Sequence, residues 1–112
     1  MDEVSNEFLE LQHQFPGSKQ FQEGGIAFYF IPGLRMPPGC HPQQTDVLLC
    51  PTQRDGYSSR LFFATHIEGP APRNWNGDCP ILGRQWYAFS WNDIQGLRLT
   101  DLVFAHVRAL LP

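Results

Sequence analysis

The chain has 112 residues, a formal net charge of −3 and 13% aromatic residues, which suits one domain over 1–112 that buries a core without staples. Charged residues make up 17%, fewer than the roughly 25% of typical soluble domains, so part of the surface is expected to meet a partner. The sequence lacks a basic stripe for nucleic acid, the run of about 18 apolar residues that a membrane span needs, and a basic signal peptide. We therefore expect a cytoplasmic protein.

Three cysteines, Cys40, Cys50 and Cys79, are an odd number, and no two of them form a CxxC motif. A disulfide framework is therefore not expected, and we interpret them as free thiols. A zinc site built on Cys40 and His41 is disfavoured because no ligand pair has finger-like spacing. We expect neither a metal nor a cofactor.

Residues 3–15 are predicted to form a helix, because Val4, Phe8, Leu11 and Phe15 fall on one helical face. Acidic residues at its start suit the positive end of the helix dipole, and the Pro-Gly pair that follows it ends it.

Three strands are predicted next, at 26–31, 46–50 and 61–65. The first is apolar throughout and is expected to be covered on both faces, with the following Pro-Gly pair closing it. The Pro/Gly-rich segment 36–44 and the polar segment 52–59 read as loops, so the strands are expected to form an antiparallel meander.

Residues 68–85 show no periodicity and are predicted to be a structured functional loop. Trp86 and Trp91 are expected to pin this loop against a closing helix that Thr100 caps. His106 falls on the apolar face of that helix and is expected to be a satisfied core residue. The predicted fold is therefore α+β, with an N-terminal helix, an antiparallel meander, a long loop and a C-terminal helix.

Four segments carry a family resemblance. MPPGC at 36–40, followed by DVLL, resembles an "LPPGY…DVLL" motif, with Cys40 in place of the tyrosine, and FATHI at 63–67 is similar to an "F-x-T-x-I" strand end. NGDCPIL at 76–82 is similar to a "DG-x-ICLDIL" segment that carries a catalytic cysteine. GRQWYAFS at 83–90 resembles a "G-x-x-W-x-x-[FW]-S" segment. These motifs, in this order, resemble the ubiquitin-conjugating enzyme superfamily, and most closely its prokaryotic family E.

The resemblance runs from about residue 15 to 111 and implies a ubiquitin-conjugating-like fold. It also implies that a ThiF-type activating enzyme passes the C-terminus of a ubiquitin-like protein to this chain, which transfers it to a protein target. A role in antiphage defence is plausible only by this resemblance. The eukaryotic His-Pro-Asn motif is absent, and the bacterial Ser-Arg-His ending reads Ser90-Trp91-Asn92. A "YP…P" element survives only as Gly56-Tyr57.

The sequence offers two candidate nucleophiles and does not decide between them. Cys79 follows a Gly-containing turn at the expected surface, and a thiol is a few per cent ionised at neutral pH without a strong base. Ser90 stands where the bacterial family has its serine, and it would carry an oxyester in place of a thioester. Ser90 needs an activating base, for which His66 or Asp93 are candidates. The structural alternatives are a loop cysteine without a role and a serine satisfied by backbone hydrogen bonds.

Asn74 and Asn76 are candidate donors to the tetrahedral oxyanion, although Asn76-Gly77 is also an ordinary turn dipeptide. His66 ends a predicted strand and is more often a packing residue than a base. Three functions therefore stay open: an active conjugating enzyme, an inactive relative that binds the activating enzyme or the modifier, and an unrelated cysteine hydrolase. The last is disfavoured because no Cys/His pair has a recognisable signature.

Overall fold

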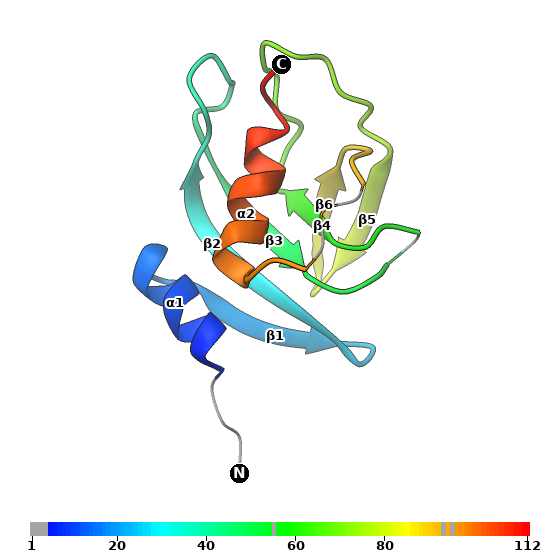
Figure 1. Ribbon diagram of the computed structural model, residues 1–112. Helices are drawn as coiled ribbons and strands as arrows, with labels where there is room; N and C mark the ends of the chain where they lie inside the picture. The colour runs from blue at the N-terminus through cyan, green and yellow to red at the C-terminus, as the bar shows by residue number, and fades with distance from the viewer. Residues whose placement is uncertain (1–4, 55, 93, 95) are drawn as a thin grey trace.

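A computed structural model describes residues 5–54, 56–92, 94 and 96–112, and it is an α+β fold with two helices and a six-stranded antiparallel sheet (Figure 1). The elements in chain order are α1 (Asn6–Gln14), β1 (Lys19–Glu23), β2 (Ile26–Arg35), β3 (Gln44–Cys50), β4 (Arg60–Phe63), β5 (Gly77–Ile81), β6 (Arg84–Ala88) and α2 (Leu99–Arg108).

The strand order in the sheet is β1-β2-β3-β4-β6-β5. The first four strands form a meander of successive antiparallel neighbours, as the sequence predicts. The last two form a hairpin that joins the meander through the pair Phe63 and Tyr87. The sheet curls, so the hairpin stands across from the meander rather than extending a flat sheet (Figure 1).

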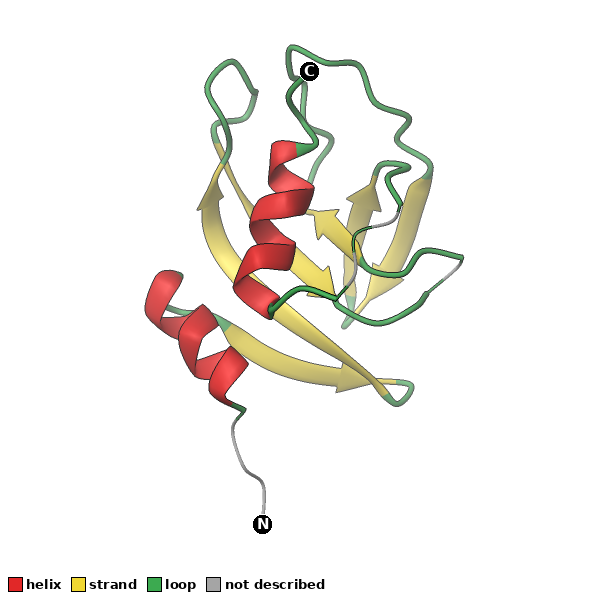
Figure 2. Cartoon of the chain, in the orientation of Figure 1, coloured by secondary structure: helices red, strands yellow, loops and turns green. Residues whose placement is uncertain are grey.

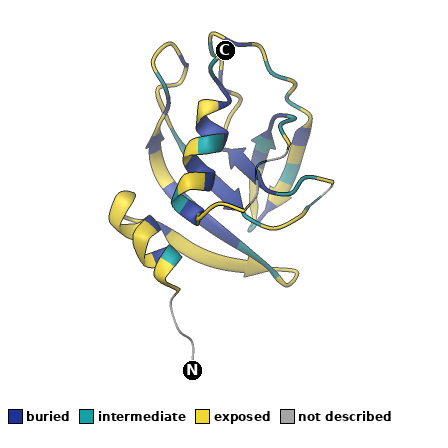
Figure 3. Cartoon of the chain, viewed as in Figure 1, coloured by how far each residue is buried: buried dark blue, intermediate teal, exposed yellow. Residues whose placement is uncertain are grey.

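Both helices lie on the same face of the sheet (Figure 2), where their apolar sides build the main core. Alternate residues of each meander strand point to this face, as the two-residue period of a strand requires. The helix surfaces turned away from the sheet are exposed (Figure 3). The main core includes Phe8 and Leu11 of α1, Val103 of α2, and Ile31 and Phe63 of the sheet.

A second core fills the other face of the curled sheet. There, meander residues such as Phe28 and Phe62 meet Ile81 and Trp86 of the hairpin. Trp86 is 2% exposed, and its indole N–H donates to the Ile81 carbonyl at 3.1 Å. Because both faces are covered, each of these strands has a continuous apolar stretch, at 26–31 in β2, 47–50 in β3 and 61–63 in β4.

The carboxylate of Glu23, at the end of β1, links this strand to the β5–β6 turn. It accepts hydrogen bonds from the Leu82 backbone N–H at 3.2 and 3.3 Å, although the two residues lie 59 positions apart. Leu82 sits in the β5–β6 turn with a left-handed φ of 55°, which is uncommon for a residue other than glycine. The Glu23 contact therefore anchors a strained turn beside the edge strand.

The predicted first helix is confirmed over Asn6–Gln14, with Ser5 as the N-cap through a 3.1 Å bond from the Phe8 N–H. Val4 lies outside the described residues. The prediction that the Pro-Gly pair at 32–33 closes the first strand is wrong. β2 continues to Arg35, and a register shift between Ile31 and Leu34 absorbs the proline, which could not donate to the ladder.

Three further parts of the fold differ from what the sequence predicts. The first strand of the meander, Lys19–Glu23, was not predicted, because its residues are exposed and mostly polar. The span 68–85, predicted to be a loop, contains β5 and the start of β6. Trp86 packs in the second core and not against the closing helix.

The closing helix starts two residues earlier than a Thr100 cap would allow. Its N-cap is Arg98, whose side chain makes no capping bond. Instead, the carboxylate of Glu7 on α1 accepts a hydrogen bond from the Leu99 N–H at 3.1 Å. A cap supplied by another helix satisfies the same orphan N–H group as a local one.

Candidate functional site

Ser90 lies two residues after β6, at the open end of the hairpin, and is half-buried. Its backbone N–H donates to the Asn74 carbonyl at 2.7 Å, which fixes the residue against the segment before β5. Its Oγ accepts a hydrogen bond from the Tyr57 hydroxyl at 3.1 Å. The side chain is thus held in place by a group from a distant part of the chain.

Tyr57 comes from the turn between β3 and β4. Two backbone hydrogen bonds of 2.9 Å between Arg54 and Tyr57 close this turn and fix the ring. The amide of Asn76 donates from Nδ2 to the Tyr57 hydroxyl at 2.8 Å. The phenol oxygen therefore lies between an amide donor and the hydroxyl of Ser90.

Arg60, the first residue of β4, supports this arrangement from inside the protein. Only 5% of its surface is exposed. The Cζ atom of Arg60 lies 4.0 Å from the centre of the Tyr57 ring, and its Nη2 donates to Asn76 Oδ1. Gly77 leaves space for this guanidinium, because a Cβ atom there would lie 3.2 Å from Arg60 Cζ.

We call these four residues, Tyr57, Arg60, Asn76 and Ser90, the Ser90 cluster. Hydrogen bonding to Ser90, and then to Asn76, lowers the pKa of the Tyr57 phenol below its ordinary value near 10. Partial burial acts in the opposite direction, and the positive charge of Arg60 lowers the pKa further. The cluster therefore makes the Tyr57 phenol more acidic than an ordinary tyrosine.

Cys79 is not on a loop, as the sequence suggested, but in the edge strand β5, paired with Trp86. Its side chain packs against the second core and is half-buried. Within the described ranges, no hydrogen bond or ion pair joins the thiol to a base or to the Ser90 cluster. The two predicted nucleophiles thus occupy different positions on the hairpin.

His66 is exposed and packs between two aromatic rings rather than beside a nucleophile. Its ring stacks on Trp75 at 5.0 Å between centroids and meets Tyr87 edge-on at 4.8 Å. Trp75 itself is half-buried against the main core, through Phe63 and Phe89. Among the residues that the structure describes, no hydrogen bond connects His66 to Ser90 or Cys79.

The two asparagines have different surroundings. Asn76 belongs to the Ser90 cluster, but its amide donates to Tyr57. Asn74 reaches Ser90 through its backbone carbonyl, while its side chain is exposed. Asp93, a candidate base, lies outside the described residues. The structure thus brings Ser90, Asn74 and Asn76 together, and it leaves Cys79 and His66 elsewhere.

Sequence reasoning missed Tyr57 and Arg60 as site residues. Tyr57 stood out only as the remnant of a family motif, and Arg60 is 16 positions from Asn76 in the chain. The available signal was an arginine at the start of an otherwise apolar strand. Such a charge is rarely buried without a partner.

A second buried polar pair lies behind Arg60. His106 of α2 is 2% exposed, and its Nε2 lies 2.9 Å from Ser59 Oγ, which donates to the Ile94 carbonyl. Burial, and secondarily the charge of Arg60, lower the pKa of His106 to about 4. The prediction of a satisfied core histidine is confirmed.

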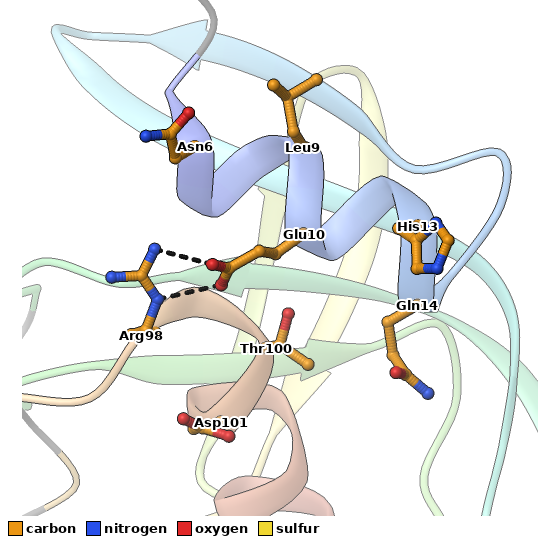
Figure 4. Close-up of a pocket in the computed structure, with 8 residues that line it drawn as sticks. All are labelled: Asn6, Leu9, Glu10, His13, Gln14, Arg98, Thr100 and Asp101. Atoms are coloured by element: carbon orange, nitrogen blue, oxygen red, sulfur yellow. Dashed lines mark hydrogen bonds and ion pairs between the residues drawn. The ribbon is translucent and has the colours of Figure 1, made fainter.

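A hollow of about 710 Å³ lies between α1 and α2, and none of the predicted site residues lines it (Figure 4). Glu10 and Arg98 bridge it through two bonds of 2.9 Å. Both side chains are about half exposed, so this bidentate pair contributes little to stability. The hollow is an open notch between two helices, with an ion pair across it.

No protein-family model, curated protein or solved structure matches the chain. Neither helix in the described part of the chain has the length and hydropathy of a membrane span. The described His, Cys, Asp and Glu side chains form no group of three or more that could hold a metal ion.

Proposed function

We propose that this chain is a ubiquitin-conjugating-like domain that accepts the C-terminus of a ubiquitin-like protein on Ser90. The acyl donor is the thioester of a ThiF-type activating enzyme, and the acceptor is an amine of a protein target. The sequence resemblance supplies the class of reaction. The choice of Ser90 over Cys79 is supported by the 3.1 Å hydrogen bond between the hydroxyls of Tyr57 and Ser90.

That bond matters because a serine hydroxyl is a weak nucleophile until a neighbouring group takes its proton. Ser90 has a polar neighbour that can change its protonation state, whereas Cys79 faces the second core. Transfer to Ser90 would form a C–O bond and break the C–S bond of the donor thioester. The second step would form a C–N bond to the target and break the C–O bond.

The α+β architecture is compatible with this proposal. A helix precedes a four-stranded meander, and a second helix follows the segment that carries Ser90. Ser90 is half-buried and lies at the end of a hairpin, where a partner's extended C-terminus can reach it.

A domain that only binds the activating enzyme or the modifier is the second candidate. One observation favours it: the Ser90 N–H donates to the Asn74 carbonyl at 2.7 Å. A backbone N–H beside the nucleophile is a common oxyanion donor, and here it is already engaged. An active Ser90 would need a donor elsewhere, for which the exposed amide of Asn74 is the remaining predicted group, since the Asn76 amide donates to Tyr57.

The test is to incubate the protein with a ThiF-type activating enzyme, its ubiquitin-like substrate and ATP, and to measure covalent adducts by intact mass. The proposal expects an adduct that Ser90→Ala abolishes and Cys79→Ala preserves. An adduct lost only in Cys79→Ala would move the reactive centre to β5. Stable binding without any adduct would support the binding module.

A further inference from the structure

We propose that Tyr57 is the catalytic group that takes the proton of Ser90, and that Arg60 and Asn76 stabilise its phenolate. This inference rests on the proposed role of Ser90 but assigns a function to a residue that the family resemblance leaves unassigned. It makes the Ser90 cluster a serine–tyrosine nucleophile that needs no histidine.

The first support is geometric. The Tyr57 hydroxyl is 3.1 Å from Ser90 Oγ, within the range expected of a general base and its nucleophile. Among the residues that the structure describes, no histidine or carboxylate bonds to Ser90. Paired backbone bonds with Arg54 hold the Tyr57 backbone, and the Asn76 bond holds its hydroxyl.

The second support is the charge around the phenol. Asn76 donates a hydrogen bond to its oxygen at 2.8 Å, and the Arg60 guanidinium lies over the ring at 4.0 Å. Both interactions strengthen when the phenol becomes negative. Among the described residues, the groups that act on the Tyr57 phenol are Arg60 from β4, Asn76 from before β5 and Ser90 from after β6, and Arg60 carries the charge in this set.

The third support is that Arg60 is buried at this point. Burying a guanidinium costs free energy unless it is hydrogen-bonded and faces negative charge or a π system. Its Asn76 bond and its contacts with the Tyr57 and Phe62 rings supply part of that compensation in the neutral state. In the ionised state, the phenolate would supply the opposite charge.

The protons balance over the two transfer steps without another reagent. The phenolate of Tyr57 accepts the Ser90 proton while Oγ attacks the acyl carbon and the donor thiolate leaves. When the target amine attacks the oxyester, the C–O bond breaks and Tyr57 O–H returns its proton to Ser90 Oγ. The amine proton passes to water, and the cluster returns to its starting state.

The experiment uses a fluorophosphonate probe that carries a rhodamine tag, which reports on an activated serine without any activating enzyme. Attack by Ser90 Oγ forms a P–O bond, breaks the P–F bond and releases fluoride. Labelling of the wild type at Ser90, located by peptide mass spectrometry, is expected to rise with pH until the Tyr57 pKa is passed. Tyr57→Phe should lower the rate about 100-fold, the typical share of a general base, and flatten this profile.

Tyr87→Phe is the matched control, because Tyr87 is also half-buried but contacts His66 instead of Ser90. It is expected to label at the wild-type rate. A second readout is the ¹³C signal of the tyrosine Cζ atoms, which follows phenol ionisation. Tyr57 should titrate below Tyr29, whose pKa is raised by burial.

The outcomes separate the two proposals. If the wild type is labelled at Ser90 and Tyr57→Phe changes neither the rate nor the pH profile, Tyr57 is not the base. Ser90 then remains the nucleophile. A modifier adduct on Ser90, without phosphonylation at any pH, likewise overturns only the tyrosine. If Ser90 undergoes neither phosphonylation nor adduct formation, both proposals are overturned.

Discussion

The Tyr57 hydroxyl and the Ser90 hydroxyl are hydrogen-bonded although 33 positions separate them in the chain. One lies in the turn that connects the meander strands β3 and β4, and the other follows the hairpin. The bond therefore exists only when the hairpin has folded back against the meander. Site assembly and tertiary folding are thus coupled.

Removing the charge of Arg60 should weaken the cluster without removing its nucleophile. Arg60→Met keeps an apolar stem but loses the cation over the Tyr57 ring and the bond to Asn76. The pKa of Tyr57 should rise, since a positive neighbour favours the ionised phenol. The pKa of His106 should also rise, since Arg60 contributes to lowering it.

NMR titration of the Tyr57 Cζ and the His106 ring measures both shifts in one sample. Arg60→Lys is the matched control, because it retains a positive charge and should leave both pKa values closer to those of the wild type. Unchanged pKa values in Arg60→Met would contradict the electrostatic account.

Gly77→Ala should disturb the cluster through contact alone. Gly77 has no left-handed φ, but a Cβ atom there would lie 3.1 Å from the Ala88 Cβ and 3.2 Å from Arg60 Cζ. We expect a loss of about 1–3 kcal/mol in the free energy of unfolding, typical of overpacking, together with a displaced Arg60. Urea denaturation measures the first effect. Asn74→Ala, an exposed side chain beside the same hairpin, should stay within about 0.5 kcal/mol of the wild type.

Acid should destabilise the protein through His106. Its pKa is lowered to about 4 in the folded state, whereas an unfolded histidine titrates near 6.5. Between these values the unfolded chain binds the additional proton, so the free energy of unfolding falls as the pH falls. From pH 7 to pH 5 this contribution should remove about 2 kcal/mol.

Urea denaturation at pH 7 and pH 5 measures that change, and His106→Gln removes the titrating ring while keeping a polar group near Ser59. The variant should lose less stability than the wild type over the same pH interval. Equal losses in the two proteins would show that His106 is not the group responsible.

Removing a buried aromatic side chain from the second core should clearly lower the free energy of unfolding. Trp86→Ala empties the centre of that core and deletes the bond to the Ile81 carbonyl, so we expect a loss of about 3–5 kcal/mol. Leu97→Ala is the comparison, because Leu97 is a large apolar residue that is 46% exposed. Its substitution should change the free energy of unfolding by less than about 0.5 kcal/mol. Similar values for both variants would mean that the hairpin does not pack as described.

The elements that the sequence predicts well are those whose apolar pattern reflects burial. The helix face of Phe8 and Leu11 and the apolar strand beginning at Ile26 are examples, since each faces a core in the structure. β1 has no such pattern, because all its residues are exposed and pairing with β2 holds it in place. The hairpin was missed because Pro80 and Gly83 resemble loop residues, while its burial depends on distant strands.

The site was predictable only in part, for a similar reason. Ser90 and Asn76 were found through motifs within one segment, whereas Tyr57 and Arg60 reach them through pairing between strands far apart in sequence. Cys79 was misplaced because a Gly-Asp-Cys-Pro run has turn-like composition. In the folded chain it lies in an edge strand, where proline is tolerated.

The most direct test of the account is the chemical lability of the modifier adduct in wild type and in Ser90→Cys. The wild-type adduct, an oxyester, should resist thiol reductants and be removed by alkali. The Ser90→Cys adduct, a thioester, should be removed by the thiol alone. The assignment of Ser90 as the acyl acceptor would be contradicted if thiol removes the wild-type adduct and removes the Ser90→Cys adduct equally well.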